Sequence, residues 1–592
     1  MERTRNDCRS SSLLLFPNGK NAESRLVRFA SYLIIVLLIA VAYGASLRNG
    51  FVWDDETFIV NNKYVYDISR WKAYFASPES ISNEPTMSRM YRPVQTLSFA
   101  LDALLWGKNA GGFHFTSMVL HAACCAAIVF AFRLLIGIRP AIVSALIFTV
   151  HPALSEGVLS LSARGNQLYT LFSLLSLGYF VRTERPFDKN HLLCFTALSI
   201  ALFSKEPAIA LAALLPLVQI GFKLPWEIRS KRSLFLYVPM VVSVVFYLLV
   251  RAHVVGAANV SPYWGGSFWS SALMQSKVFV VYLSLLAWPF NLQGRYVITS
   301  PAPFPDFSLI GALSLNVILV LAGVIAYRAG GRGRLFALAT AWFYLSLAPV
   351  SNIIPIPGSM MGERFIYFTF AGIIPLLLVA AVGGSVIKKR RVVIAICGIV
   401  LLSAWIVTDI TRTSVWRDNK SFFVLASKQV PTSIAVQVRM AQEEVASKDV
   451  ESALRRLQGI LTSKSVSPIE RDMAMVHYWY ARALLEADRP AEAYKEFKIS
   501  TTLFKETPKE LVLYLAEAAT RSGDFSGALV LLEEELRKTG EDDGLWNGLG
   551  NVYLTTGNLP SAISCYQQAL RINPGNTKAA TNLQFALGKR AS

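Results

Sequence analysis

The chain contains few charged residues for its length. Asp, Glu, Lys and Arg make up 16% of its 592 residues, and hydrophobic residues make up 53%; an average soluble domain is roughly 25% charged. A soluble protein this apolar would have too little polar surface, so the bilayer is the expected solvent if the apolar residues come in runs of about 20. They do so as far as residue 411, whereas the tail has ordinary soluble composition. The scarcity of charge therefore predicts a membrane domain followed by a soluble one.

Cysteine is also scarce, and the charge that is present is mostly basic. None of the six cysteines forms a pair with metal-site spacing, so no disulfide framework or zinc site is predicted. The net charge of +19 would suggest nucleic acid binding in a soluble protein. Here, however, Lys and Arg lie in short loops between apolar runs, which is the positive-inside pattern of membrane proteins. We therefore expect no nucleic acid partner.

Three common catalytic motifs are missing. The sequence has no HExxH motif, no GxGxxG fingerprint and no P-loop, so nothing predicts a zinc-protease site or a cytoplasmic site for a nucleotide sugar. No ligand set requires a metal either, and the metal stays unknown. A divalent cation bound by an acidic pair is the one cofactor that the residues suggest.

The apolar runs predict an all-α membrane domain over residues 29–411 with about eleven spans. The first run, 29–47, is longer than the apolar region of a signal peptide, so it is interpreted as an uncleaved span that follows a cytoplasmic segment, 1–28. An odd number of spans then places the tail outside the cytoplasm, in the periplasm or the lumen. A further apolar segment at 276–290 would break this parity if it crossed the membrane, and it is interpreted as re-entrant or interfacial on the outer side. The other ten runs lie near 112–135, 140–156, 165–182, 190–204, 206–222, 233–252, 308–327, 334–350, 364–387 and 392–410.

The first outer loop, 48–111, carries an acidic turn a few residues beyond the first span. It contains Asp54, Asp55 and Glu56 in succession. Neighbouring like charges raise at least one pKa, and a carboxylate can act as a general base toward an acceptor hydroxyl. A solvated acidic turn is the alternative interpretation.

Other ionisable residues gather at the predicted outer ends of the spans. Arginine there offers bidentate donors to phosphate, although each residue alone could also be an interfacial anchor or a structural ion pair. The cations that could form a phosphate pocket are Arg92, Arg164, Lys205 and Arg364. Further candidates for the pocket are His114, His151, Glu156, Glu206, Glu363 and Tyr367.

The tail contains tetratricopeptide (TPR) repeats. With Asp543 as position 1 of a 34-residue unit, the small and aromatic residues fall at the positions of the repeat pattern: Trp546, Leu549, Gly550, Tyr553, Ala562, Tyr566, Ala569 and Pro574. Weaker units precede it at 474–507 and 509–542, an earlier helix pair lies near 435–464, and a capping helix near 577–589. We therefore expect a linker at 412–434 and a repeat domain at 435–592 that binds proteins.

Taken together, these features resemble one family, the transmembrane and TPR repeat-containing O-mannosyltransferases with their bacterial relatives. The resemblance covers nearly the whole chain. The matching residues are Asn49 to Asp55 with Asn61-Asn62, Tyr91-Arg92-Pro93, Gly112-Phe113-His114, Leu120-His121, His151-Pro152 with Glu156, Arg164, Ser204-Lys205-Glu206, Ser351-Asn352, Glu363-Arg364 with Tyr367, and Trp416 to Asn419. The short repeat array is more typical of a bacterial-type relative.

The resemblance implies a GT-C fold and transfer of a sugar from a polyprenyl- or dolichyl-phosphate carrier to Ser or Thr of an extracytoplasmic protein. It makes Asp54 and Asp55 the catalytic pair, with Asp54 the first candidate for the base. Glu56 goes beyond this two-acid pattern and its role is open; Glu56 and Glu156 are the candidates for an accessory acid. It makes the four cations of the phosphate pocket the donor-binding residues. The enzyme would lie in a bacterial inner membrane or, in a eukaryote, the endoplasmic reticulum. Transfer to a glycolipid or cell-wall polymer, and a non-enzymatic membrane scaffold, remain the alternatives.

Overall fold

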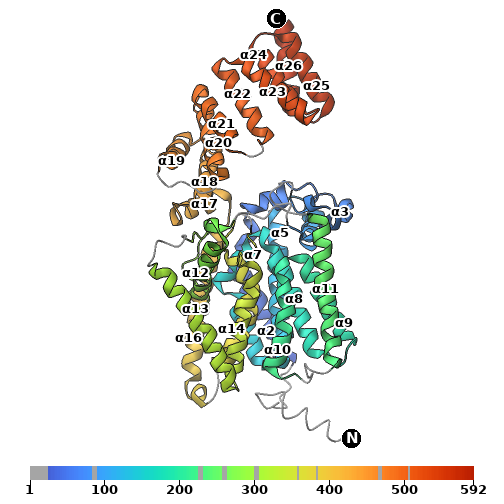
Figure 1. Ribbon diagram of the computed structural model, residues 1–592, viewed down its shortest axis with the longest axis vertical. Coiled ribbons are helices and arrows are strands. Elements are labelled where there is room, and N and C mark those ends of the chain that lie inside the picture. Colours follow the sequence, from blue (N-terminus) through green and yellow to red (C-terminus); the bar gives the residue numbers. More distant parts are fainter. Residues whose placement is uncertain are drawn as a thin grey trace. The chain divides into compact units, whose positions relative to one another are not determined.

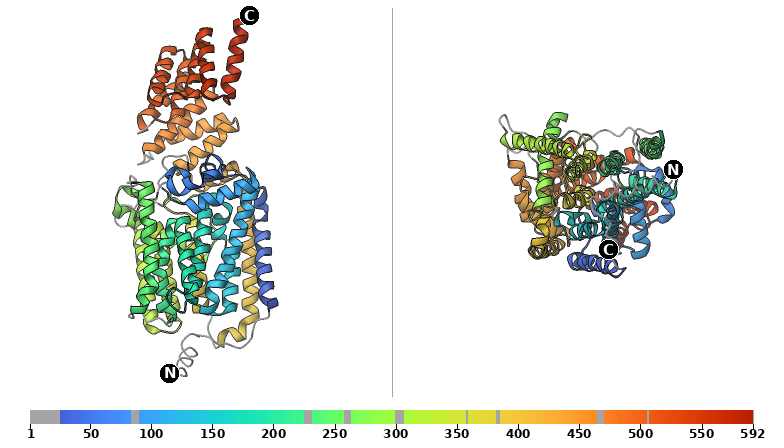
Figure 2. Two further views of the ribbon diagram at one scale, coloured as in Figure 1. Left: turned by 90° about the vertical axis from the view of Figure 1, so that its right-hand side faces the viewer. Right: turned by 90° about the horizontal axis from the view of Figure 1, so that it is seen from below.

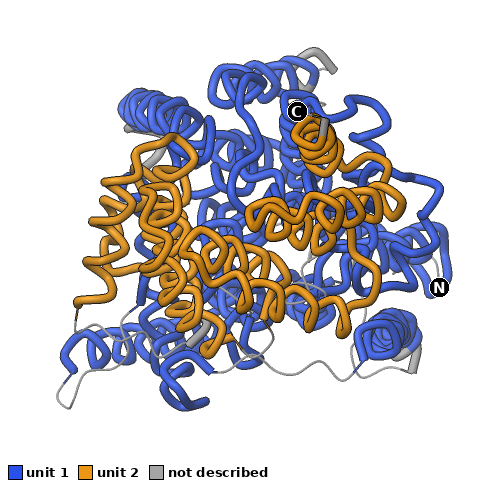
Figure 3. The backbone as a smooth tube through the Cα atoms, turned by 90° about the horizontal axis from the view of Figure 1, so that it is seen from above, with its two compact units in different colours: residues 1–422 blue, residues 423–592 orange. Residues whose placement is uncertain are grey.

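The computed structural model describes residues 25–82, 90–224, 231–256, 263–298, 306–356, 359–381, 385–463, 470–504 and 507–591. These residues form helices and no β-strand, which confirms the all-α prediction. The chain divides into two compact units, Met1–Phe422 and Phe423–Ser592 (Figure 3). Most of the predicted cytoplasmic segment, 1–24, lies outside the described residues. The predicted domain boundaries remain predictions.

Unit 1 is a bundle of helices whose axes are nearly parallel or antiparallel, with the short helices of the first loop gathered at one end (Figure 1). Its α-helices are α2 (Arg25–Tyr43), α3 (Trp71–Ala76), α4 (Pro93–Trp106), α5 (Ala110–Ile136), α6 (Ile138–Thr149), α7 (Ser155–Leu159), α8 (Arg164–Arg182), α9 (Lys189–Ser204), α10 (Ala210–Phe222), α11 (Lys231–Val255), α12 (Phe268–Ala287), α13 (Phe307–Ala329), α14 (Gly333–Leu347), α15 (Tyr367–Ala381) and α16 (Ser385–Val415). Between them lie the short turns η2 (Glu56–Val60), η5 (Pro152–Leu154), η6 (Leu161–Ala163), η7 (Glu206–Ile209) and η10 (Glu363–Ile366). The end of the bundle that carries the acidic turn Asp54–Glu56 is called the polar end.

Eight helices within the described ranges are long and apolar enough to cross a membrane, and the bent pair α6 and α7 would make a ninth. Eleven spans were predicted. Helix α9 has only 16 residues, and α8 carries many polar side chains because most of it is buried among other helices rather than facing lipid. The runs predicted at 165–182 and 190–204 are therefore helices that fall short of the length or the apolarity of a lipid-facing span.

The segment predicted as re-entrant is different in the structure. Helix α12 runs without a break from Phe268 to Ala287 and is itself one of the candidate spans. The helix begins before the predicted 276 and ends at Ala287. Whether it crosses the bilayer or lies at its surface stays a prediction, and so does the side of the membrane on which the tail lies.

The first and last candidate spans, α2 and α16, pack side by side (Figure 2). The Thr413 hydroxyl at the end of α16 donates to the carbonyl oxygen of Ala42 on α2 at 3.3 Å. The Asn49 amide donates in turn to the Thr413 carbonyl oxygen at 2.9 Å. This packing brings the start of the first outer loop against the end of α16, although more than 360 residues separate them in the chain.

The first loop has a hydrophobic core of its own. Phe58 and Ile59 pack with Phe99 of α4 and Phe113 of α5. The Asn62 side-chain amide, which is buried, lies within hydrogen-bond distance of the carbonyl oxygens of residues 58, 80 and 81. Burial of aromatic rings and satisfied backbone groups together fix this loop on the bundle. The acidic turn therefore sits on a rigid support.

Unit 2 is a stack of helix pairs, and the starts of α22, α24 and α26 follow the 34-residue spacing of the repeat pattern. After α17 (Asn419–Gln429), which crosses from unit 1, come α18 (Ile434–Ala446), α19 (Val450–Thr462), α20 (Glu470–Glu486), α21 (Pro490–Leu503), α22 (Lys509–Ser522), α23 (Phe525–Thr539), α24 (Asp543–Thr555), α25 (Leu559–Ile572) and α26 (Thr577–Ala591). A Cβ at Gly550 would lie 2.4 Å from the Tyr566 ring, so only glycine allows α24 and α25 to approach this closely.

Candidate active site

The two aspartates of the acidic turn have different environments. Asp55 is fully buried, and its two carboxylate oxygens accept hydrogen bonds from the backbone N–H groups of Val52 at 3.1 Å and Ser162 at 2.7 Å. Burial raises the pKa of Asp55 to about 7, although both hydrogen bonds oppose that rise. Asp55 thus anchors the first loop to η6, and this position favours a structural role rather than the catalytic role predicted for it.

Asp55 should make the folded protein less stable as the pH rises. Its pKa is raised from 3.8 to about 7 on folding, so the folded state binds the extra proton and stability is lost between those pH values, at about 1.4 kcal/mol per pH unit at most. In Asp55→Asn this fall should disappear. Thermal unfolding of the full chain at pH 5, 6 and 7 measures it, with the exposed Asp67→Asn as the control. Parallel pH profiles for wild type and Asp55→Asn would contradict it.

Asp54, in contrast, reaches solvent and a charged partner. Its side chain is 31% exposed, and one carboxylate oxygen lies 3.7 Å from Nη2 of Arg364 at the start of η10. The same guanidinium donates through Nη1 to Glu156 of α7 at 2.5 Å, and the Arg364 backbone N–H donates to the other Glu156 oxygen at 2.8 Å. Glu156, whose side chain is buried, holds the Arg364 guanidinium in the orientation in which it faces Asp54. Three of the predicted site residues therefore meet.

A second group of cations lies beside this cluster. Lys205 and Arg364 both contact the ring of Phe365, at 5.3 and 5.4 Å from its centroid. The buried Lys205 ammonium donates to the Asn166 side-chain oxygen at 2.7 Å and is acted on by the charges of Arg92, Arg364, Glu206 and Glu156. Arg92 itself pairs with Glu206 at 3.1 Å. Arg364 thus faces the acidic turn, and Lys205 lies beside Arg364 and contacts Asn166.

Glu56 is bound by Asn419, a residue for which the sequence predicted no role in the site. Its Oε1 accepts a hydrogen bond from the Asn419 side-chain amide at 2.7 Å, and the Asn419 oxygen accepts from the backbone N–H of Trp53 at 2.8 Å. Asn419 belongs to the Trp416–Asn419 stretch that carried part of the family resemblance. Nothing in the linear pattern ties it to a turn more than 360 residues away, so only the packing of α2 on α16 reveals the contact.

Arg164 does not join the phosphate pocket that was predicted. It is fully buried, its Nη1 lies 2.6 Å from the carboxylate of Asp102 on α4, and its Nη2 donates to the Phe113 carbonyl oxygen at 2.9 Å. Its charge is neutralised and its guanidinium is enclosed between Phe99 and Phe113. The geometry therefore favours a structural ion pair, because no face of this arginine is open to a ligand.

Breaking the Arg164–Asp102 pair should damage folding rather than chemistry. Arg164→Met leaves the buried Asp102 carboxylate with only the Thr116 hydroxyl as a partner, and loss of the cation from such a pair costs about 3–5 kcal/mol, whereas replacing both partners by apolar residues is often close to neutral. We expect Arg164→Met to lower the amount of folded protein in the membrane and Arg164→Met with Asp102→Leu to recover much of it. Fluorescence-detected size-exclusion chromatography measures the amount. A double variant that accumulates no better than the single one would contradict the structural assignment.

The remaining predicted residues take structural positions around the cluster. Glu363 accepts from Arg412 at 2.8 Å and from the Tyr296 hydroxyl at 2.7 Å. The Tyr367 hydroxyl lies 2.5 Å from Nδ1 of His121. The rings of His114 and His151 lie near backbone carbonyl oxygens, of Gly50 at 3.4 Å and Leu286 at 3.3 Å. All of these side chains are buried, so in this arrangement they support the site rather than line it.

The acids of the turn do not converge on one point. Asp54 faces Arg364, Asp55 accepts from backbone N–H groups, and Glu56 binds Asn419. Within the described part of the chain, no three His, Cys, Asp or Glu side chains are grouped to hold a metal ion. A divalent cation usually needs several converging oxygen ligands, and the turn as arranged does not fit one.

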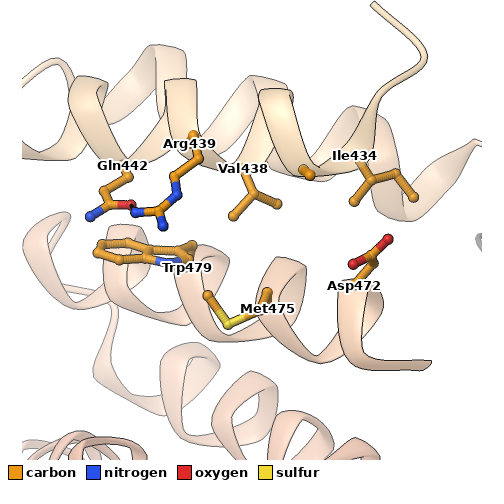
Figure 4. A pocket seen from close by; sticks show the side chains of 8 residues that line it. Ile434, Val438, Arg439, Gln442, Asp472, Met475 and Trp479 are labelled. Atoms are coloured by element: carbon orange, nitrogen blue, oxygen red, sulfur yellow. Dashed lines mark hydrogen bonds between the residues drawn. The ribbon is translucent and has the colours of Figure 1, made fainter. Parts of the chain in front are cut away.

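Unit 2 contains a small cavity of about 110 Å³ between α18 and α20. Ile434, Val438 and Met475 line its apolar part, and the Trp479 indole lies flat against the side chains of Arg439 and Gln442 (Figure 4). A larger hollow of about 590 Å³ is lined by residues of α23, α24 and α25, among them Trp546 and Tyr553. TPR repeats generally bind proteins, and both hollows are lined in part by apolar side chains.

The chain is similar to known glycosyltransferases over most of its length. Protein O-mannosyl-transferase TMTC3 of Mus musculus is 23% identical over 533 residues, covering 82% of this chain and 56% of its own length. Protein O-mannosyl-transferase TMTC4 of Homo sapiens is 24% identical, with 73% and 66% covered. Protein O-mannosyl-transferase F38B6.6 of Caenorhabditis elegans is 25% identical, with 69% and 59% covered. The chain thus spans between about half and two thirds of the length of these relatives.

The repeat unit has matches of its own. The tetratricopeptide repeat family model matches residues 545–576, within the unit whose sequence pattern is nearly complete. Among solved structures, the TPR protein YrrB has 15% identity at a TM-score of 0.24, covering 31% of this chain and 86% of its own. A chain of the Cut9–Hcn1 heterotetramer has 13% identity at a TM-score of 0.25, covering 88% and 95%. The predicted resemblance to membrane O-mannosyltransferases with TPR repeats is therefore confirmed, at low identity.

Proposed function

We propose, from this homology to protein O-mannosyl-transferases, that the chain is a GT-C-type membrane glycosyltransferase that modifies proteins. It transfers mannose or another hexose from a polyprenyl- or dolichyl-phosphate carrier to Ser or Thr of an extracytoplasmic protein. The observation that carries the proposal is the position of Asp54. It is the one acid of the conspicuous turn that pairs with a cation and remains partly open to solvent.

In the proposed reaction, the hydroxyl oxygen of the acceptor Ser or Thr bonds to the anomeric carbon of the sugar. The bond between that carbon and the phosphate oxygen breaks, and its electron pair stays on the phosphate. Asp54 takes the hydroxyl proton as general base. Arg364 and Lys205 stabilise the negative charge that grows on the leaving phosphate, and Arg92 is held nearby by Glu206. The products are the glycosylated protein and the lipid phosphate.

Glu156 supports this chemistry through Arg364. It binds both the side chain and the backbone N–H of that residue, so the guanidinium is oriented before any substrate arrives. A preorganised cation stabilises developing charge without reorganising during the reaction. We propose a supporting role for Glu156 and not that of a second base.

In this proposal each unit receives a different substrate. A lipid carrier enters sideways from the bilayer, and an acceptor protein arrives from water and is held by the repeats of unit 2, which raises its effective concentration. This requires the polar end of the bundle and unit 2 to lie outside the cytoplasm, with the N-terminus inside. The compartment is the periplasm in a bacterium or the lumen of the endoplasmic reticulum in a eukaryote.

Glycopeptide mass spectrometry of extracytoplasmic proteins tests the proposal. Three strains are compared, one with the wild-type chain, one without it and one with Asp54→Asn. We expect a hexose on Ser or Thr to vanish in both altered strains while the variant protein accumulates normally in the membrane. Identical proteomes in all three would refute a protein acceptor, and a change in glycolipids instead would favour the glycolipid reaction. Loss in the deletion strain alone would favour a scaffold or a different base.

A further inference from the structure

One side chain closes the acidic turn from outside. The Oδ1 atom of Asn419 accepts a hydrogen bond from the backbone N–H of Trp53 at 2.8 Å, and its Nδ2 donates to Oε1 of Glu56 at 2.7 Å. Asp54 and Asp55 lie between the two residues that it contacts. Asn419 thus holds both ends of the four-residue segment that contains the proposed base.

The backbone of this turn is in a conformation that needs support. Trp53 has a φ of +56°, a region that bulky residues rarely adopt. Such a conformation persists only where the surrounding structure imposes it. Here its N–H is held by Asn419, and its indole packs against the Phe422 ring at 5.2 Å between centroids. Without Asn419, the turn could relax toward an ordinary φ and carry Asp54 away from Arg364.

The segment that carries Asn419 is itself fixed to the start of the loop. The Gly50 N–H donates to the Arg417 carbonyl oxygen at 2.8 Å. The ring of Trp416, which is buried, packs on Phe422 at 4.7 Å between centroids. Residues 413–422 therefore form a rigid support behind the acidic turn, and Asn419 is the side chain that transmits that rigidity to Asp54.

We propose that Asn419 is a positioning residue for the transfer reaction. It holds the turn so that Asp54 faces both Arg364 and the incoming acceptor hydroxyl. The inference rests on the proposed function, in which Asp54 is the base. Asn419 itself contacts the turn and neither substrate, so its contribution appears in the rate of the chemical step rather than in substrate binding.

The test measures sugar transfer by the purified full chain with Asn419→Ala. A displaced base should lower kcat by about tenfold to a hundredfold, while KM for the lipid donor and the acceptor stays within about threefold. The matched control is Lys420→Ala, the next and exposed residue of α17, which should behave as wild type. In the Asp54→Asn background, adding Asn419→Ala should cause no further loss, because the base it positions is already gone.

Each other outcome overturns a different statement. A wild-type kcat for Asn419→Ala beside an inactive Asp54→Asn refutes the positioning role and leaves the function intact. A raised KM at unchanged kcat, or an additive loss in the double variant, makes Asn419 a structural residue only. A fully active Asp54→Asn refutes the proposed base itself. If Asn419→Ala does not fold, the isosteric Asn419→Asp serves instead. It keeps the acceptor for Trp53 but loses the donor to Glu56, so a wild-type kcat for it would equally refute the positioning role.

Discussion

Purified Asp54→Asn protein is expected to transfer sugar about 10²- to 10⁴-fold more slowly than wild type, the range that a lost general base produces. Asparagine has nearly the shape of aspartate, and Asp54 pairs with Arg364 only at 3.7 Å, so the turn should keep its geometry. It cannot take the proton of the acceptor hydroxyl at neutral pH. The rate of hexose transfer to an acceptor protein from a lipid-phosphate donor measures the effect, with folded protein matched between samples.

A control in the same loop distinguishes loss of the general base from loss of one negative charge anywhere in the loop. Glu79 is exposed in that loop, and Glu79→Gln removes one negative charge without touching the turn, so it should keep the wild-type rate. Formate, which fits the space left by a truncated carboxylate, should restore part of the activity of Asp54→Gly. Transfer by Asp54→Asn within about threefold of wild type would be too small a loss for a general base and would remove Asp54 from the mechanism.

Arg364→Lys is expected to lower kcat/KM for the lipid donor by about 10²- to 10³-fold, the loss that follows removal of one oriented donor to a developing charge. Lysine keeps the positive charge, but its single ammonium cannot bind Glu156 and face Asp54 at the same time as the planar guanidinium does. The buried Glu156 still finds a cation, so the variant should fold.

Steady-state kinetics with varied donor show which step Arg364 serves. A rise in KM alone indicates that the guanidinium binds the donor phosphate equally in the ground and transition states, and a fall in kcat indicates charge stabilisation in the transition state. Arg417→Lys is the matched control, because that side chain is 65% exposed and lies outside the cluster. An Arg364→Lys enzyme as active as this control would refute the role of Arg364.

The choice between neighbouring residues could not be made from the sequence. Asp54 and Asp55 have the same side chain and adjacent positions, yet one is partly open and the other is sealed against backbone N–H groups. Likewise, Arg164 and Arg364 looked equivalent as phosphate ligands. Arg164 is neutralised by Asp102, a buried carboxylate on another helix. The residues next to an arginine in the sequence do not predict which distant acid it will pair with.

The number of membrane spans is a second property that the sequence did not determine. Hydropathy identifies helices that face lipid, because lipid contact requires a continuous apolar surface. Hydropathy does not show that an interior helix such as α8 is surrounded by other helices rather than by lipid. It also placed the start of α12 too late, because polar residues precede the apolar centre of that helix.

What the sequence by itself determined were the features set by local chemistry. Long apolar runs require a bilayer, the 34-residue pattern requires stacked helix pairs, and three successive acids mark a turn at the end of the first span. Tertiary structure alone decided which acid is reachable, which cations remain for a ligand and which side chain, Asn419, holds the turn. Burial and pairing depend on residues that are close in space and hundreds of positions apart in the chain, so they arise only when α2 packs on α16.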